Sequence, residues 1–482
     1  MQASGRRRRS RRRRADAASA VRLPSQRPAG ITALFILLLA MLLGGGTRND
    51  LMSDLTVQLA SSVVLVWGLN RLSWAQISVP TRHFLLLVLA VALLPLIQLL
   101  PLPTVLTHAM AGRDVLSAGR ESLGLGSPMF APWSLDPNAT LAALRGLLPA
   151  AALAVIGCQL NAIWLKRLSL AVVAIALMMV PLGIAQVAQG PHSELRPYVP
   201  TNVHDAVGLF ANRNHYAAFL ATALALVMAH LVRSGYRHLP RSTGHLIRVG
   251  WILAGAMLLL GIVLSRSRGG VGIAGLAMLV WLAVAFIRRR RDKETYYWLL
   301  GFACISGLLA FQFGFLAIAD RLNQQGDIRI DVFADVMALS GRFGWLGTGL
   351  GSFQAMYAAY EPLELVGAKI LTHAHNDWAE LWVELGLLLI PVTLAFGYWF
   401  WKRLQGLRGR GSHHALHLGG ALIVVMLCLH SLVDYPLRTT AVSTMFVLAC
   451  LLLVSPLPPR QEGEPGPGIS PRPPELARDR HD

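Results

Sequence analysis

Apolar stretches of about 17–22 residues recur along most of this chain, and short basic segments separate them. An α-helix rises about 1.5 Å per residue, so one such stretch crosses a hydrocarbon core about 30 Å thick. Of the 482 residues, 54% are hydrophobic and 14% are charged, more apolar sequence than a soluble core buries. The pattern predicts an all-α polytopic membrane protein.

About twelve spans are expected from these stretches. They are predicted at 30–46, 52–70, 83–103, 139–160, 167–188, 212–232, 249–266, 269–287, 296–318, 381–401, 418–434 and 438–455.

The loops between the spans predict the orientation of the chain. With the N-terminus inside, the cytoplasmic loops are all basic, as the positive-inside rule requires: 70–82, 161–167, 233–248, 288–295 and 402–417. Both termini are therefore expected in the cytoplasm. Larger segments fall on the outer face at 104–138, 189–211 and 319–380.

The domain organisation follows from these positions. We expect a disordered basic tail over 1–29, helices over 30–318, an outer loop with a helical cap over 319–380, helices over 381–455 and a disordered tail over 456–482. A cleaved signal peptide is disfavoured, because no small-x-small cleavage site is evident near 44–50.

A net charge of +19 does not indicate nucleic-acid binding here. Eight of the 44 Lys and Arg residues lie in Arg6–Arg9 and Arg11–Arg14, and most others lie in loops between spans. That distribution fits membrane topology and anionic lipid. The four cysteines fall inside apolar runs, where they are expected to pack and not to form disulfides.

Four polar stretches interrupt or border the spans: 208–215, 264–270, 371–388 and 430–438. On the predicted topology all four lie at the outer membrane-water boundary. Ionisable groups at membrane depth are costly and usually functional, so this convergence predicts one site.

The stretch 371–388 holds two histidines, His373 and His375, before a span. Asn376 or Asp377 could cap that helix. If the helix begins earlier, one face carries His373, Asp377, Glu380 and Glu384. The alternative is a polar cap whose two tryptophans, Trp378 and Trp382, anchor a span at the interface.

Arg266 and Arg268 lie at an outer turn, where the positive-inside rule disfavours arginine. Guanidinium groups bind phosphate bidentately, and the glycines beside them let a ligand approach the backbone. These arginines therefore predict an anionic partner, and so does Arg213. The alternative is snorkelling to lipid headgroups or pairing with a carboxylate such as Asp434.

Other chemistry is disfavoured. The glycine-rich run 344–351 lacks the Gly-Lys-Ser/Thr ending of a phosphate loop and is expected to form a turn on the membrane surface. No HExxH is present, and the i, i+2 spacing of His373 and His375 suits a helical metal site poorly. No metal site and no cofactor is predicted.

In combination the motifs resemble the O-antigen ligase and polymerase superfamily. They are Asn-Arg-Asn-His-Tyr-Ala at 212–217, Ser-Arg-Gly-Gly at 267–270, Gly-Thr-Gly-Leu-Gly-Ser-Phe at 347–353, His-Ala-His-Asn-Asp at 373–377 and Glu-Leu-Gly at 384–386. The resemblance covers about residues 30–455 and implies a GT-C-like glycosyltransferase of the bacterial inner membrane, whose large periplasmic loop lies between the ninth and tenth spans.

The resemblance also implies a reaction, in which a glycan moves from undecaprenyl diphosphate to an acceptor hydroxyl on the periplasmic face. His375 is implied as the catalytic base, with His373 as second choice, and Arg213, Arg266 and Arg268 would hold the diphosphate. The supporting residues are Asn212, Asn214, His215, Asn376, Asp377 and Asp434. Direct attack would invert the anomeric configuration without a metal.

The acceptor stays open between a lipid A-core, a growing polysaccharide and a protein. A transporter is a rival class, but transporters place their sites near the bilayer midplane and not at one face. A flippase for the same lipid-linked glycan differs from a transferase in leaving the glycan-lipid bond intact.

Overall fold

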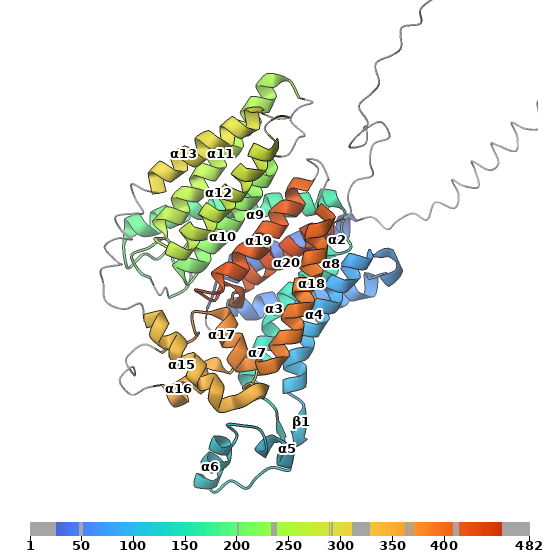
Figure 1. Cartoon of the computed structure of the whole chain (residues 1–482), viewed down its shortest axis with the longest axis vertical. Helices are drawn as coiled ribbons and strands as arrows, with labels where there is room; N and C mark the ends of the chain where they lie inside the picture. The colour runs from blue at the N-terminus through green and yellow to red at the C-terminus, as the bar shows by residue number, and fades with distance from the viewer. Residues whose placement is uncertain are drawn as a thin grey trace, which may run out of the picture.

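The computed structural model describes residues 26–47, 52–199, 202–232, 239–288, 290, 293–310, 328–361, 366, 370–407 and 414–455. Within them the chain is a bundle of α-helices with one short antiparallel ribbon (Figure 1). Residues 1–25 of the predicted N-terminal tail (1–29) and the predicted C-terminal tail (456–482) lie outside the described residues. So does the segment 311–327, where the predicted ninth span ends and the predicted outer loop (319–380) begins.

Eight helical stretches in the described residues are long and apolar enough to cross a membrane. They are α3 (Met52–Arg71), α4 (Val79–Gln98), α7 (Pro137–Gly146) with α8 (Leu148–Gly157), α9 (Ala162–Gln189), α10 (Arg213–Leu231), α11 (Arg241–Leu264), α12 (Arg268–Arg288) and α17 (Asp377–Leu385) with α18 (Leu389–Leu407). Shorter apolar helices are α2 (Arg27–Leu43), α19 (Ala415–His430) and α20 (Thr440–Val454). The helices bear out a multi-pass membrane protein, and the count of twelve spans stays a prediction.

The described chain also forms the 18-residue helix α13 and several shorter elements. These are η1 (Trp74–Gln76), β1 (Pro101–Pro103), α5 (Thr104–His108), α6 (Asp114–Ser122), β2 (Phe130–Pro132), α13 (Lys293–Ala310), α15 (Ile328–Phe343), η4 (Gly344–Leu346), α16 (Phe353–Tyr360), η5 (Gly386–Leu388) and η7 (Pro436–Arg438). The helix-like stretch expected at 328–339 lies inside α15.

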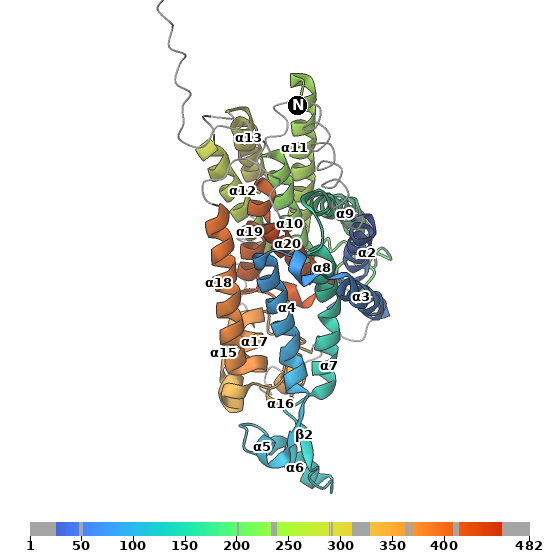
Figure 2. The ribbon, with the colours of Figure 1, turned by 90° about the vertical axis from the view of Figure 1, so that its right-hand side faces the viewer.

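Near prolines, two helices end earlier than the predicted spans. The stretch predicted to be helical to residue 103 ends at Gln98, and Pro101 and Pro103 lie in β1, which pairs with β2. The stretch predicted at 139–160 divides at Leu147, with Pro149 in the first turn of α8. Figure 2 shows the ribbon with α5 and α6 projecting beyond the end of α4.

Helix α10 forms the centre of the bundle, and every residue from His215 to Leu231 is buried. Small residues allow α9, α11, α12 and α19 to pack closely around it. A Cβ added to Gly270 of α12 would lie 2.3 Å from the Cβ of Ala217 in α10. Glycine therefore allows α12 to approach α10 where both helices begin.

Apolar side chains on the outer helices face away from this core. Leu59 and Val63 of α3, Leu279 of α12 and Leu394 of α18 are more than 60% exposed. Exposed apolar surface on several helices of membrane-spanning length is what lipid contact requires.

One end of the bundle carries the polar residues. There α10 and α12 begin and α11 and α19 end, and Figure 1 shows α15, α16 and α17 gathered below them. We call this end the site end.

Candidate functional site

A pocket at the site end brings together all three arginines that the sequence predicted as anion ligands. Its lining is Arg213, Asn214, Arg266, Arg268, Gly269, His430, Val433 and Asp434. These residues come from the starts of α10 and α12, the turn before α12, and the α19–α20 turn. We call it the arginine pocket.

Two helices begin at the arginine pocket. Arg213 is the first residue of α10, and the side chain of Asn212 caps that helix by accepting from the amide of Asn214 at 2.8 Å. Arg268 begins α12, where the Ser267 hydroxyl accepts from the amide of Gly270 at 3.1 Å. Helix N-termini favour anions, so backbone and side chains reinforce each other here.

Backbone strain marks two of the predicted site residues. Among the described residues, Arg266 and His375 are the non-glycine residues with positive φ, each at 51°. A side chain in this left-handed region costs energy that the surrounding fold must supply, and such positions concentrate at functional sites.

Asp205 is the carboxylate that two of the pocket arginines approach. Arg213 Nη1 lies 2.5 Å from its Oδ2, and Arg266 Nη1 lies 3.7 Å from its Oδ1. The Asp205 side chain is 6% exposed, whereas that of Arg266 is 55% exposed. Asp205 is thus a fixed negative charge beside the arginines.

Asp434 connects the arginine pocket to the histidines. One oxygen accepts from the Asn214 side-chain amide, and the other lies 3.7 Å from His215 Nε2 and 3.6 Å from His375 Nδ1. Burial acts to raise the pKa of Asp434, but the nearby imidazoles of His215, His375 and His430 lower it well below its usual value. The carboxylate therefore stays ionised.

The ring of Tyr435 positions three imidazoles. His373 stacks on it with ring centroids 4.3 Å apart, and His375 and His215 meet it edge-on at 5.2 Å and 4.7 Å. Burial raises the pKa of its hydroxyl, so the ring stays neutral.

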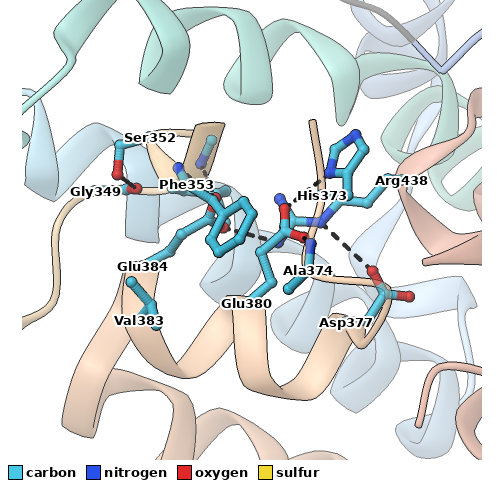
Figure 3. A network of polar contacts seen from close by, with 12 residues as sticks. Gly349, Ser352, Phe353, His373, Ala374, Asp377, Glu380, Val383, Glu384 and Arg438 are labelled. Carbon is cyan, nitrogen blue, oxygen red and sulfur yellow. Dashed lines mark hydrogen bonds and ion pairs between the residues drawn. The ribbon is translucent and has the colours of Figure 1, made fainter. Parts of the chain in front are cut away.

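A second polar cluster lies beside the first, shown in Figure 3. Arg438 contacts three buried carboxylates of α17: Asp377 at 3.5 Å, Glu380 at 3.3 Å and Glu384 at 2.8 Å. Burial acts to lower the pKa of Arg438, but these carboxylates raise it well above its usual value. We call these four residues the Arg438 cluster.

The Arg438 cluster fixes three parts of the chain to one another. Glu380 accepts from His373 Nδ1 at 2.9 Å and from the amide of Ala374 at 2.9 Å. Asp377 accepts from the Ser431 hydroxyl at 2.7 Å. Asn376 accepts from the amides of Trp378 and Ala379, so the helix begins at Asp377 and leaves His373 in the preceding loop.

The glycine-rich run 347–351 packs against α17, and its expected place on the membrane surface stays a prediction. Glu384 accepts from the amide of Gly351 at 2.8 Å, and the amide of Gly349 donates to the Glu384 carbonyl at 3.0 Å. Gly347 has φ 70°, and an added Cβ would lie 2.6 Å from that same carbonyl. The glycines are needed for this close approach to α17.

Every residue predicted for the site lies at the site end, in two connected groups. Arg213, Arg266 and Arg268 face the arginine pocket, and His375 and His215 share Asp434 with it. Asp377 belongs to the Arg438 cluster, His373 contacts Glu380 of that cluster, and Asn212 and Asn376 act as helix caps.

Sequence reasoning missed Asp205, Tyr435 and Arg438. The stretch 430–438 was recognised as polar, but no role followed for its last residues. Within the described part of the chain, no group of three or more His, Cys, Asp or Glu residues is arranged to hold a metal ion.

An apolar helical bundle with buried charges gathered at one end defines a multi-pass membrane protein with a polar site at one end. Residues 253–394 match the family described as O-antigen ligase. The match confirms the resemblance to the O-antigen ligase and polymerase superfamily, and it implies a glycosyl-transfer enzyme of a bacterial membrane that acts on a lipid-linked glycan and an acceptor. No curated protein matches the chain.

Proposed function

We propose that this protein transfers a glycan from undecaprenyl diphosphate to an acceptor hydroxyl at the periplasmic face of the bacterial inner membrane. One observation carries the proposal: three arginines from separate elements line one pocket, and a carboxylate of that pocket, Asp434, also faces His375. An anion-binding group and a proton acceptor thus lie side by side, as transfer from a diphosphate requires.

The arginines hold the diphosphate in this proposal. Guanidinium groups bind phosphate oxygens bidentately, and they stabilise the negative charge that develops as the sugar-phosphate bond breaks. The N-termini of α10 and α12 add positive backbone charge on the same side. The charge is met by protein groups, so we expect the reaction to need no metal.

His375 accepts the proton of the acceptor hydroxyl. Its Nδ1 faces Asp434 at 3.6 Å, a separation that a bound substrate can shorten, and this leaves Nε2 for the acceptor. The acceptor oxygen bonds to the anomeric carbon, the carbon-phosphate oxygen bond breaks, and undecaprenyl diphosphate leaves. Attack opposite the leaving group inverts the anomeric configuration.

His373 is the second candidate for the base, and one observation favours it. Its Nδ1 lies 2.9 Å from Glu380, closer than His375 lies to Asp434. Glu380 also contacts Arg438 and the amide of Ala374, so this pairing belongs to the Arg438 cluster and not to the arginine pocket. We therefore assign His373 to positioning.

Substitution of each histidine tests the assignment. Purified His375→Ala is expected to bind the undecaprenyl-diphosphate glycan with wild-type affinity, because the arginines are intact, and to lose about 10²–10⁴ in single-turnover rate. His373→Ala is the matched control, with a smaller loss. The assay follows release of undecaprenyl diphosphate and so distinguishes a transferase from a flippase.

Three results would contradict the proposal. Wild-type turnover by His375→Ala would show that His375 is not the base. Wild-type donor binding by Arg268→Ala would show that Arg268 does not bind the phosphates. Loss of all turnover in EDTA would show that a metal meets the charge. Lipid A-core, a polysaccharide end and a peptide serve as alternative acceptors in the same assay.

A further inference from the structure

Asp205 lies in the loop between α9 and α10, with its side chain against two arginines of the arginine pocket. Its partner at 2.5 Å, Arg213, is one of the groups that the proposed function assigns to the diphosphate. The carboxylate and the substrate phosphates would thus compete for the same guanidinium groups.

The backbone around Asp205 is held firmly. Arg196 donates to the carbonyls of Asp205 at 3.0 Å and Val203 at 2.7 Å. The next amide, that of Ala206, donates to the carbonyl of Leu264, two residues before Arg266. Buried Gln186 accepts from the amides of Val207 and Gly208 at 3.1 Å and 2.9 Å. The position of the carboxylate is therefore set by the fold.

The arginines are held less completely than Asp205. Arg266 approaches at 3.7 Å, beyond hydrogen-bond distance, and its side chain is 55% exposed. Within the described part of the chain, neither Asp205 Oδ1 nor Arg213 Nε has a hydrogen-bond partner, although both atoms are buried. Buried polar atoms without partners are costly. A bound anion could accept a hydrogen bond from Arg213 Nε, because Arg213 lines the pocket.

We propose that Asp205 is a built-in counter-ion of the arginine pocket, which pairs with Arg213 and Arg266 in the empty enzyme and yields them to the diphosphate of the lipid-linked donor. The inference rests on the proposed function, since it identifies what the donor displaces. Its consequence is that Arg213 and Arg266 keep a negatively charged partner when the pocket is empty.

The exchange favours release of the product. In the donor both phosphates are esterified, whereas breaking the sugar-phosphate bond leaves a terminal phosphate whose second ionisation lies near pH 6. The product is therefore more negative than the donor and would bind the arginines more tightly. A fixed carboxylate that competes for two of them opposes that tighter binding and so speeds turnover where release is slow.

The test is the affinity of the purified full-length protein, in detergent, for inorganic pyrophosphate and for undecaprenyl diphosphate. Asp205→Asn keeps the size of the side chain and removes its charge, and we expect both ligands to bind about tenfold more tightly. Glycan transfer by this variant should show a lower KM for the donor, a lower kcat and stronger inhibition by undecaprenyl diphosphate.

Three variants complete the design. Glu194→Gln removes an exposed carboxylate from the same loop and should leave both affinities unchanged. Asp205→Glu keeps the charge and should bind as the wild type does. Asp205→Ser removes the same charge. It is used instead of Asp205→Asn if thermal unfolding shows that Asp205→Asn is not folded.

Each outcome is decisive. Unchanged or weaker binding by a folded, uncharged Asp205 variant would overturn the inference, because Asp205 would then serve to orient Arg213. Arg268→Ala reports separately on the proposed function: if it binds pyrophosphate as the wild type does, the pocket is not a diphosphate site, whatever Asp205 does.

Discussion

Asp434 is a single carboxylate that lies next to both the proposed diphosphate site and the proposed catalytic base. It lines the arginine pocket and also faces His215 and His375, which come from different elements. A carboxylate in this place holds one tautomer of the imidazole and stabilises the imidazolium that forms as the proton is accepted. Its contribution to the reaction should therefore appear in the rate at saturating donor.

Substitution of Asp434 tests this role. Asp434→Asn is expected to lose about 10²-fold or more in single-turnover rate at saturating donor. Asp136→Asn is a matched control, because asparagine also caps a helix and Asp136 caps α7 through the amide of Ala139 at 3.0 Å. Equal rates for the two variants would exclude an orienting role.

The acid side of the pH profile should not come from Asp434. Its folded pKa is lowered, so its contribution to stability is complete above the unfolded value of about 3.9 and is lost as the pH falls through the folded value. A loss of activity between neutral pH and pH 5 is therefore not expected to report Asp434. The Asp434→Asn profile should keep such an acid limb.

At the scale of elements, Arg438 holds α17, the glycine-rich run and the α19–α20 turn in one arrangement. Its guanidinium contacts Asp377, Glu380 and Glu384, whose side chains are at most 4% exposed. Breaking a buried ion pair by removing one partner leaves uncompensated charge and costs about 3–5 kcal/mol. Arg438 is thus a positioning residue for the loop that carries both histidines.

We expect Arg438→Met to lower the thermal unfolding temperature in detergent and Arg438→Lys to recover only part of the loss, since ammonium cannot reach three carboxylates as a fork does. Arg342→Met is the matched control: Arg342 lies on the ring of Tyr360, 4.9 Å from its centroid, in exposed surface. An unfolding temperature for Arg438→Met equal to that of Arg342→Met would show that the cluster contributes nothing net to stability.

Local sequence patterns predicted much of this arrangement. The contacts between residues far apart in the sequence could not be predicted from it. Asp377, Glu380 and Glu384 follow i, i+3, i+7 spacing, so their shared face was readable from the sequence. Nothing local indicates that one arginine, 54 residues beyond Glu384 in sequence, lies against that face. Asp205 was missed for the same reason, because only the fold brings a single loop aspartate to Arg266.

At the scale of the whole molecule, charge differs between the two ends of the bundle. At the site end, arginines meet carboxylates: Arg213 meets Asp205 and Arg438 meets Glu384. At the opposite end, α11 begins at Arg241 and α12 ends at Arg288, and the segment that follows continues with arginines to 291. Basic loops favour the cytoplasmic side, so the run of arginines at this end favours a site end that faces outward.

Reporter fusions test this orientation without any assay of transfer. Alkaline phosphatase folds only outside the cytoplasm, so a fusion after residue 345, between α15 and α17, should be active. Fusions after residues 240 and 290, next to the starts of α11 and α13, should be inactive, with a cytoplasmic reporter at the same three positions giving the opposite pattern. Because α10 and α12 both begin at the site end, the result at 345 also places the arginine pocket. An inactive phosphatase at 345, with a working cytoplasmic reporter there, would show that the pocket faces the cytoplasm. Transfer at the periplasmic face would then be ruled out, and so would the roles assigned to His375 and Arg268 in that reaction.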